Sequence, residues 1–218
     1  MQVVIITGAG GGIGRAMAEH QAKAGWRVVC SDINEAANAA TAAHVGGEAI
    51  LGDVSSERDV NAGINQYKPL SEWTLAQWNQ IIATNLTASF LLARAGEDAL
   101  RASKGAMVLT SSTRAHMSEP GTFAYSASKG GLVALTHALA MSLQPDVRVN
   151  CVSPGWIDTG KHGPIEHADH ARHPVGRVGR PEDIAAAAAF LLDATQSGFM
   201  TGQEMIVDGG MTRKMIYV

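Results

Sequence analysis

Short apolar runs rich in β-branched residues alternate along the chain with longer stretches in which apolar positions recur at helical spacing. Apolar strands separated by amphipathic helices are typical of a parallel sheet covered by helices on both faces. The pattern predicts an α/β fold, a doubly wound parallel sheet in a single domain over residues 1–218. The predicted strands are Val3–Thr7, Arg27–Ser31, Ala49–Leu51, Ala106–Thr110, Arg148–Val152 and Met205–Val207, and the predicted helices are Ile13–Ala24, Glu35–His44, Leu75–Leu100, Ser126–Leu143 and Pro181–Asp193.

Composition narrows the class of protein. Hydrophobic residues make up 46% of the 218 residues and charged residues 17%, which excludes a disordered chain. The net charge of −3 and the lack of a basic run argue against nucleic acid as a partner. Cys30 and Cys151 lie in apolar runs and are expected to be buried free thiols. No stretch approaches the ~20 apolar residues of a membrane span, and Val3–Thr7 leaves no room for a signal peptide, so we expect a soluble cytoplasmic domain without a membrane partner.

A glycine-rich turn joins the first strand to the first helix, with the sequence Thr7-Gly8-Ala9-Gly10-Gly11-Gly12-Ile13-Gly14. Glycines allow a sharp turn and let a pyrophosphate approach the backbone, and the helix N-terminus offers N–H groups to the anion. The strand before and the helix after the turn favour dinucleotide binding over a glycine-rich surface turn.

Asp32 ends the second predicted strand. A carboxylate there can accept hydrogen bonds from both adenosine ribose hydroxyls and would repel a 2′-phosphate. No Arg or Lys lies in Ala9–Gly12, and Arg15 is interpreted as an ordinary helix residue. NAD is therefore favoured over NADP. Asp32 is also a candidate N-cap of the helix predicted over Glu35–His44, and the two roles are compatible.

Tyr125 and Lys129 are four residues apart in a predicted helix, so their side chains share one face. A tyrosine with its ordinary pKa near 10 is a poor base at neutral pH. A neighbouring cation favours phenolate, and lowering the pKa by ~2–3 units requires roughly 3–4 kcal/mol. The pair predicts an acid/base site, with an exposed helix pair as the alternative.

The glycine spacing and the pentapeptide Tyr125-Ser126-Ala127-Ser128-Lys129 resemble the short-chain dehydrogenase/reductase family from Val3 to Gly210. The resemblance implies a Rossmann-like fold and an oxidoreductase that transfers a hydride between a nicotinamide cofactor and a secondary alcohol or ketone. It implies Tyr125 as general acid/base and Lys129 as the residue that binds the nicotinamide ribose and lowers the pKa of Tyr125. Ser112, thirteen residues before Tyr125, would bind the substrate oxygen, and Asn85 would hold a water of the proton relay.

The same resemblance implies cofactor contacts along the chain. Asp53 and Val54 would meet the adenine, and Ile157 and Thr159 the nicotinamide carboxamide. It also implies a homotetramer or homodimer. The implied cofactor-binding residues are Gly8, Gly12, Ile13, Gly14, Asp32, Asp53, Val54, Asn61, Ala62, Gly63, Tyr125, Lys129, Pro154, Gly155, Ile157 and Thr159.

Residues 160–180 correspond to the substrate-binding loop of the family and are rich in basic side chains. His167, His170 and His173 recur every three residues, a spacing that drifts round a helix, and no cysteine accompanies them, so no metal site is predicted. The basic loop suggests an acidic or hydroxylated substrate. Arg114 and His116, just beyond Ser112, are further candidates for the pocket wall, and their alternative is an exposed turn.

The chain departs from the family after Val60, which is followed directly by Asn61-Ala62-Gly63. The family has a helix and a strand here, and its sheet order 3-2-1-4-5-6-7 places that strand beside the first one. One hypothesis, which we favour, is that a stretch between Val60 and Asn61 is omitted. The other is a sheet rebuilt with a gap, and the Val60–Asn61 Cα separation distinguishes them, since adjacent residues lie 3.8 Å apart.

Two other functions compete with an NAD-dependent alcohol dehydrogenase. A 3-oxoacyl-type NADPH ketoreductase has the same chemistry, but Asp32 opposes its cofactor. An NAD-binding regulatory protein without turnover is favoured only by the missing strand. The presence of Asn85, Ser112, Tyr125 and Lys129 favours an enzyme, because binding alone does not need a proton relay.

Overall fold

The computed structural model describes residues 1–51, 66–161 and 163–215. Every predicted strand and helix is present, with boundaries shifted by up to three residues, and two short helices, α6 and α8, were not predicted. The strands are β1 (Val3–Thr7), β2 (Arg27–Asp32), β3 (Glu48–Leu51), β4 (Ala106–Thr110), β5 (Arg148–Pro154) and β6 (Glu204–Val207). The helices are α1 (Gly12–Lys23), α2 (Glu35–Val45), α3 (Leu75–Ile82), α4 (Ala88–Ser103), α5 (Phe123–Leu143), α6 (His167–Ala171), α7 (Pro181–Leu192) and α8 (Ala194–Ser197).

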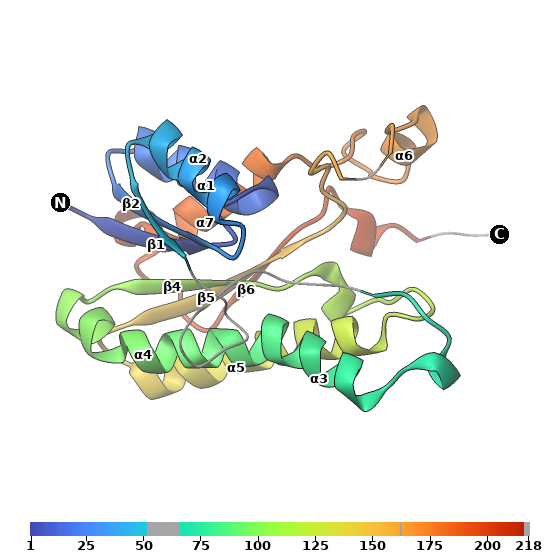
Figure 1. Cartoon of the computed structure of the whole chain (residues 1–218), viewed down its shortest axis with the longest axis horizontal. Coiled ribbons are helices and arrows are strands. Elements are labelled where there is room, and N and C mark those ends of the chain that lie inside the picture. The colour runs from blue at the N-terminus through green and yellow to red at the C-terminus, as the bar shows by residue number, and fades with distance from the viewer. Residues whose placement is uncertain (52–65, 162, 216–218) are drawn as a thin grey trace.

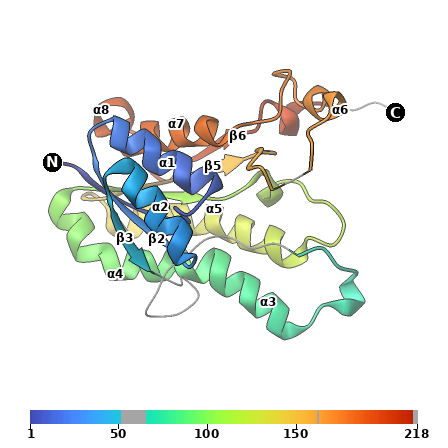
Figure 2. The same ribbon diagram turned by 45° about the horizontal axis from the view of Figure 1, so that its top comes forward.

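The strands of the described residues form two parallel sheets of three, in the orders β1-β2-β3 and β4-β5-β6. Helices α1, α2 and α7 lie on one side of the molecule and α3, α4 and α5 on the other, with β4, β5 and β6 between them (Figures 1 and 2). Helix α1 contacts α7, and α7 in turn contacts β4, β5 and β6, so these helices join the two sheets. The α/β fold with helices on both sides is therefore confirmed.

No strand lies between β1 and β4 within residues 1–51, 66–161 and 163–215, so the predicted continuous sheet is divided in two there. Val60 and Asn61 lie outside the described residues, and both hypotheses for this point of the chain stay predictions.

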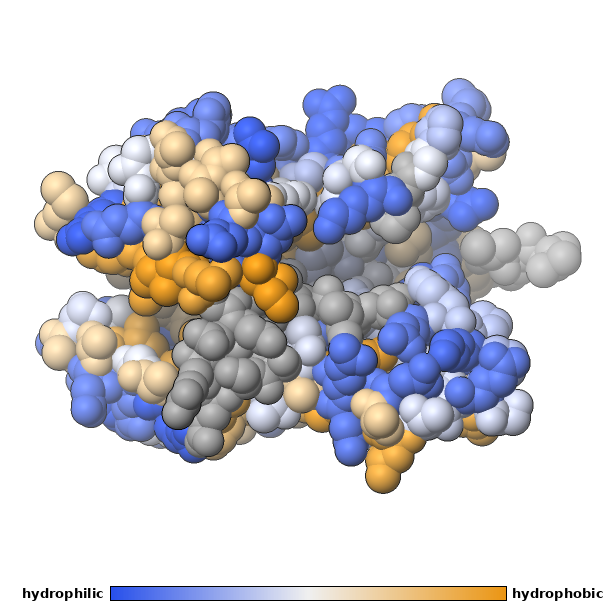
Figure 3. Space-filling model, viewed as in Figure 1, coloured by the Kyte–Doolittle hydropathy of each residue, from blue (hydrophilic) through white to orange (hydrophobic). Residues whose placement is uncertain are grey.

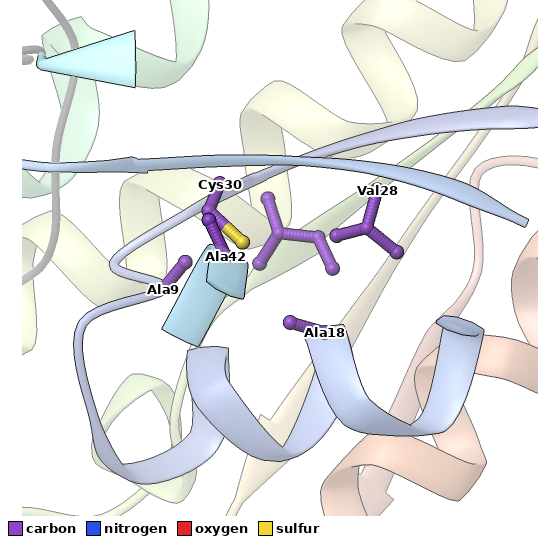
Figure 4. Close-up of a cluster of buried hydrophobic side chains, with 6 residues drawn as sticks. Ala9, Ala18, Val28, Cys30 and Ala42 are labelled. Carbon is purple, nitrogen blue, oxygen red and sulfur yellow. The ribbon is translucent and has the colours of Figure 1, made fainter. Parts of the chain in front are cut away.

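The first sheet has one face packed and the other face open. Ile6, Val28 and Cys30 pack against Ala18 of α1 and Ala42 of α2 (Figure 4). Because side chains alternate along a strand, Val3 and Ile5 of β1 point to the opposite face, where they are 53% and 66% exposed. Figure 3 shows apolar surface gathered along this sheet. The open face lies beside the division between the two sheets.

A π-helical turn over Ala83–Thr87 separates α3 from α4, where the sequence predicts one unbroken helix over Leu75–Leu100. Thr74 caps the N-terminus of α3 through a reciprocal pair of hydrogen bonds with Gln77, which fixes where this long helical segment begins. Single π turns inside helices are frequent at functional sites. This turn contains Asn85, which sequence analysis places in the proton relay.

Both cysteines are free and buried, as predicted. Within the part of the chain that the structure describes, we find no helix that is both long enough and apolar enough to span a bilayer.

Candidate active site

The glycine-rich turn has the close backbone packing that only glycine permits. Gly8 and Gly12 have φ values of +70° and +52°, in the left-handed region that favours glycine. A Cβ on Gly14 would lie 2.1 Å from the carbonyl oxygen of Gly8, so α1 approaches the turn more closely than any other residue allows. Gly11 is the N-cap of α1 and offers no side chain to the first N–H groups of the helix. These groups suit an anion such as a pyrophosphate.

Asp32 is buried beside the glycine-rich turn. Its Oδ2 accepts a hydrogen bond from the Gly10 N–H at 2.9 Å, and its Oδ1 accepts one from the Asn34 N–H, also at 2.9 Å. A Cβ on Gly10 would lie 2.8 Å from Oδ2, so glycine is required at this contact. Each carboxylate oxygen can accept a further hydrogen bond. The carboxylate is thus held at the turn with acceptor capacity left for ribose hydroxyls.

The alternative role of Asp32 as a helix cap is wrong. The N-cap of α2 is Asn34, whose Oδ1 accepts a hydrogen bond from the Ala37 N–H at 3.0 Å. Strand β2 extends to Asp32, one residue further than predicted, so the helix begins too late for Asp32 to cap it.

The segment after β5 lies against the glycine-rich turn. A Cβ on Gly12 would lie 3.2 Å from Cγ2 of Thr159, and Ile13 packs against the cluster that contains Ile157. The structure therefore brings together residues from the turn and from the segment after β5. Pro154 ends β5, and a Cβ on Gly155 would lie 2.7 Å from Cβ of Asp208.

Five residues of the predicted cofactor site cannot be placed. Asp53, Val54, Asn61, Ala62 and Gly63 all lie outside the described residues, and their contacts stay predictions. The cradle formed by the glycine-rich turn, Asp32 and Thr159 fits a dinucleotide, because its tight backbone contacts leave no room for side chains and its N–H groups and carboxylate match a pyrophosphate and a ribose.

Tyr125 and Lys129 face each other on α5. The Lys129 ammonium lies 5.5 Å from the centre of the Tyr125 ring, and Nζ donates a hydrogen bond to the Thr110 carbonyl at 2.8 Å. Lys129 is only 6% exposed, and this burial lowers its pKa from 10.5 to about 8. The alternative of an exposed helix pair is wrong.

Ser112 and Ser111 have different partners. Ser112 forms a side-chain hydrogen bond with Tyr125, whereas the hydroxyl of Ser111 donates to the Lys129 carbonyl at 2.8 Å. The structure thus separates the two adjacent serines, as the sequence predicts.

The pKa of Tyr125 lies above its ordinary value of 10, chiefly because the ring is buried. Its hydrogen bond with Ser112 and the positive charge of Arg114 lower this pKa, and the phenol of Tyr67 raises it. The expectation of a pKa below the ordinary value is wrong for these protein groups, because desolvation of the phenolate outweighs the favourable charges.

Asn85 is buried in the π-helical turn, and its side-chain amide donates to Oγ of Ser128 at 3.1 Å. Ser128 in turn donates to the Tyr125 carbonyl at 2.7 Å. Ser128 therefore links the predicted relay residue to the helix that carries Tyr125 and Lys129. Sequence analysis assigned it no role, although its place directly before Lys129 in the pentapeptide was a signal.

Two of the histidines in residues 160–180 have structural partners. The Val178 N–H donates to Nδ1 of His170 at 3.1 Å, and Nδ1 of buried His173 lies 3.0 Å from the Asp169 carbonyl oxygen. A search of the described residues finds no group of three His, Cys, Asp or Glu side chains suited to a metal ion.

The fold and these contacts define a dinucleotide-binding α/β protein with a buried Tyr–Lys pair beside a serine. Two family profiles match the sequence: short chain dehydrogenase over residues 2–61 and enoyl-(acyl carrier protein) reductase over residues 60–212. The chain belongs to the short-chain dehydrogenase/reductase family. It is accordingly an oxidoreductase that acts on CH–OH groups with a nicotinamide cofactor.

Similar proteins cover nearly the whole chain. An uncharacterized oxidoreductase of Thermotoga maritima is 39% identical over 250 residues, 99% of this chain and 98% of that protein. A cis-4-hydroxycyclohexanecarboxylate dehydrogenase of Sinomonas cyclohexanicum is 35% identical over 97% of this chain and 96% of its own. An apo SCOR enzyme from Clostridium thermocellum has a TM-score of 0.90 with 39% identity, covering 99% of this chain and 94% of that one.

The alignment with the Thermotoga protein is 32 positions longer than the 218 residues of this chain. That relative therefore contains at least 32 residues without a counterpart here. The two family matches meet at residues 60–61, where sequence analysis places the departure from the family.

Proposed function

We propose that this protein is an NAD-dependent dehydrogenase that interconverts a secondary alcohol and its ketone, with Tyr125 as general acid/base. The observation that supports it most is the buried contact of Tyr125 with both Lys129 and Ser112 at the carboxyl end of β4. A proton-transfer site needs a titratable group held in one place next to a substrate-orienting donor. The names of relatives, such as the hydroxycyclohexanecarboxylate dehydrogenase and an L-fucose dehydrogenase of Mus musculus, fit an alcohol substrate.

Each side chain has a separate task in this proposal. The bound nicotinamide cofactor supplies the hydride chemistry. Ser112 donates a hydrogen bond to the substrate oxygen and holds it beside the Tyr125 phenol, which gives or takes the proton. Lys129 keeps its ammonium under the Tyr125 ring and favours phenolate when the proton leaves. Asn85, linked to α5 through Ser128, fixes the helix turn that leads protons to solvent.

The preference for NAD rests on Asp32. Its carboxylate is fixed by two backbone N–H groups at the glycine-rich turn, and a 2′-phosphate there would meet a like charge. Arg15, the nearest arginine in sequence, is drawn away from the turn into an exposed ion pair with Glu19 at 2.9 Å. The proposal also includes self-association as a homodimer or homotetramer, which light scattering of the purified protein tests.

The division between the two sheets favours a second candidate, a protein that binds the cofactor without turnover. A sheet that lacks its central strand holds the two halves of a cofactor site less rigidly, and catalysis is more sensitive to misplacement than binding. Turnover distinguishes the two candidates.

The test is the absorbance of reduced nicotinamide, followed with NAD or NADP and a panel of sugars, steroids and hydroxy acids. We expect NAD-linked turnover by the wild type, a loss of at least 100-fold in Tyr125→Phe, and near wild-type activity in Tyr67→Phe. Tyr67 is a matched control, because the same atom is removed from a neighbouring but 59% exposed ring. Equal activity of wild type and Tyr125→Phe would contradict the proposal.

A further inference from the structure

Arg114 is held at the place where the substrate oxygen is expected. It lies in a 3₁₀ turn, Thr113–Ala115, that directly follows Ser112, and its N–H donates to Oγ of Ser112 at 3.2 Å. Its side chain is 21% exposed. Burial dominates the pKa of Tyr125, but Arg114 is close enough for its charge to lower that pKa. The guanidinium therefore acts on the same phenol as Ser112.

The partner of Arg114 is an exposed carboxylate. Oε1 of Glu119 lies 2.6 Å from Nη2 of Arg114, and the Glu119 side chain is 56% exposed. Exposed ion pairs contribute about 0–1 kcal/mol, so another carboxylate can replace Glu119 at little cost. The more buried partner of this pair is the cation, and it lies on the side of the reacting groups.

Glu119 also borders a cavity. The cavity has a volume of about 500 Å³ and is lined by Trp73, Trp78, Phe123 and Glu119. This volume is within the range of small-molecule sites. A ligand that displaces Glu119 from Arg114 thus has space for its apolar part, and the displaced carboxylate can turn to solvent.

We propose that Arg114 binds a carboxylate of the substrate, so that the enzyme acts on hydroxy acids or oxo acids, and that Glu119 occupies the guanidinium until the substrate replaces it. This inference rests on the proposed function. A guanidinium presents parallel N–H donors that match a carboxylate, and the pair becomes stronger when the bound substrate excludes water. The reacting carbon and the carboxylate are then held from adjacent residues of one short turn.

The experiment compares short 3-hydroxy acids with their primary amides, which have nearly the same shape without the charge. For 3-hydroxybutanoate and 3-hydroxybutanamide we expect a higher kcat/KM for the acid in the wild type. Arg114→Met should lower kcat/KM for the acid at least 100-fold and for the amide less than threefold. Arg27→Met is the matched control, since it removes an arginine from an exposed ion pair with Glu48 on the first sheet and should leave both values unchanged.

Glu119→Gln tests the displacement independently of whether Arg114→Met folds. With the competing charge removed, the ratio of kcat/KM for acid over amide should rise about threefold or more. Turnover of neutral alcohols without preference for acids, or an equal loss on both substrates in Arg114→Met, would overturn the inference while leaving the dehydrogenase intact. Absence of turnover with every alcohol and ketone would instead overturn the proposed function.

Discussion

Burial of the Lys129 ammonium should make the protein less stable at neutral pH than it is at alkaline pH. Its pKa is about 8 in the folded protein against an ordinary 10.5, so burying the charged form opposes folding by about 3 kcal/mol at pH 7. Between pH 8 and 10.5 the unfolded chain retains this proton and the folded chain releases it. The contribution of Lys129 to the free energy of unfolding therefore rises with pH, by about 2 kcal/mol from pH 7 to pH 9.5.

Lys129→Met isolates this effect. The substitution also removes the hydrogen bond to the Thr110 carbonyl, but the neutral amine makes that bond too, so its loss does not depend strongly on pH. We expect the difference in unfolding free energy, Lys129→Met minus wild type, to fall by about 2 kcal/mol between pH 7 and pH 9.5. Urea unfolding followed by circular dichroism measures it at each pH.

The control for this series is Lys23→Met on α1, where the lysine is exposed. Its unfolding free energy should run parallel to that of the wild type. The raised pKa of Tyr125 acts only above its ordinary value of 10, outside the range measured. If the difference between Lys129→Met and wild type were the same at both pH values, the ammonium would not be desolvated and the account of this pair would be refuted.

Three further substitutions test the site. Gly14→Ala should lower the free energy of unfolding by about 3 kcal/mol, because its Cβ would meet the Gly8 carbonyl, and chemical denaturation measures the loss. Asp32→Asn should reduce the preference in kcat/KM for NAD over NADP by about tenfold, the effect of one charged hydrogen bond; an unchanged ratio would show that Asp32 does not select the cofactor. Ser112→Ala should lower kcat by roughly 100-fold, whereas Ser111→Ala should reduce stability by about 1 kcal/mol and retain turnover. Equal kinetic effects of the two serines would contradict their separate assignments.

The strands and helices could be predicted because their cause is local. Strand β1 has an unbroken run of apolar residues, and α7 begins with a proline and acidic residues that favour a helix N-terminus. The cap of α2 could not be assigned in this way, because Asp32 and Asn34 are both capping residues. The choice depends on how far β2 pairs with its neighbours, which is a tertiary property.

The site was less predictable where it depends on contacts between distant segments. The spacing of Tyr125 and Lys129 placed them on one face of α5, but the pKa of the phenol depends on how deeply neighbouring loops bury it. The π-helical turn at Asn85 leaves the helical periodicity of Leu75–Leu100 almost unchanged, so the sequence pattern gave no sign of it. The ion pair of Arg114 with Glu119 depends on the path of the loop after Ser112, for which the sequence has no simple rule.

Transfer of isotope from labelled cofactor tests the central assignment most directly. NADH carrying deuterium at the transferred position of C4 is incubated with an oxidised substrate, and the product is examined by mass spectrometry and NMR. The wild type should place one deuterium on the new carbinol carbon, and Tyr125→Phe should bind NADH with similar affinity but form product at least 100-fold more slowly. Product without deuterium at that carbon, or equal product formation by the Tyr125→Phe variant, would contradict it.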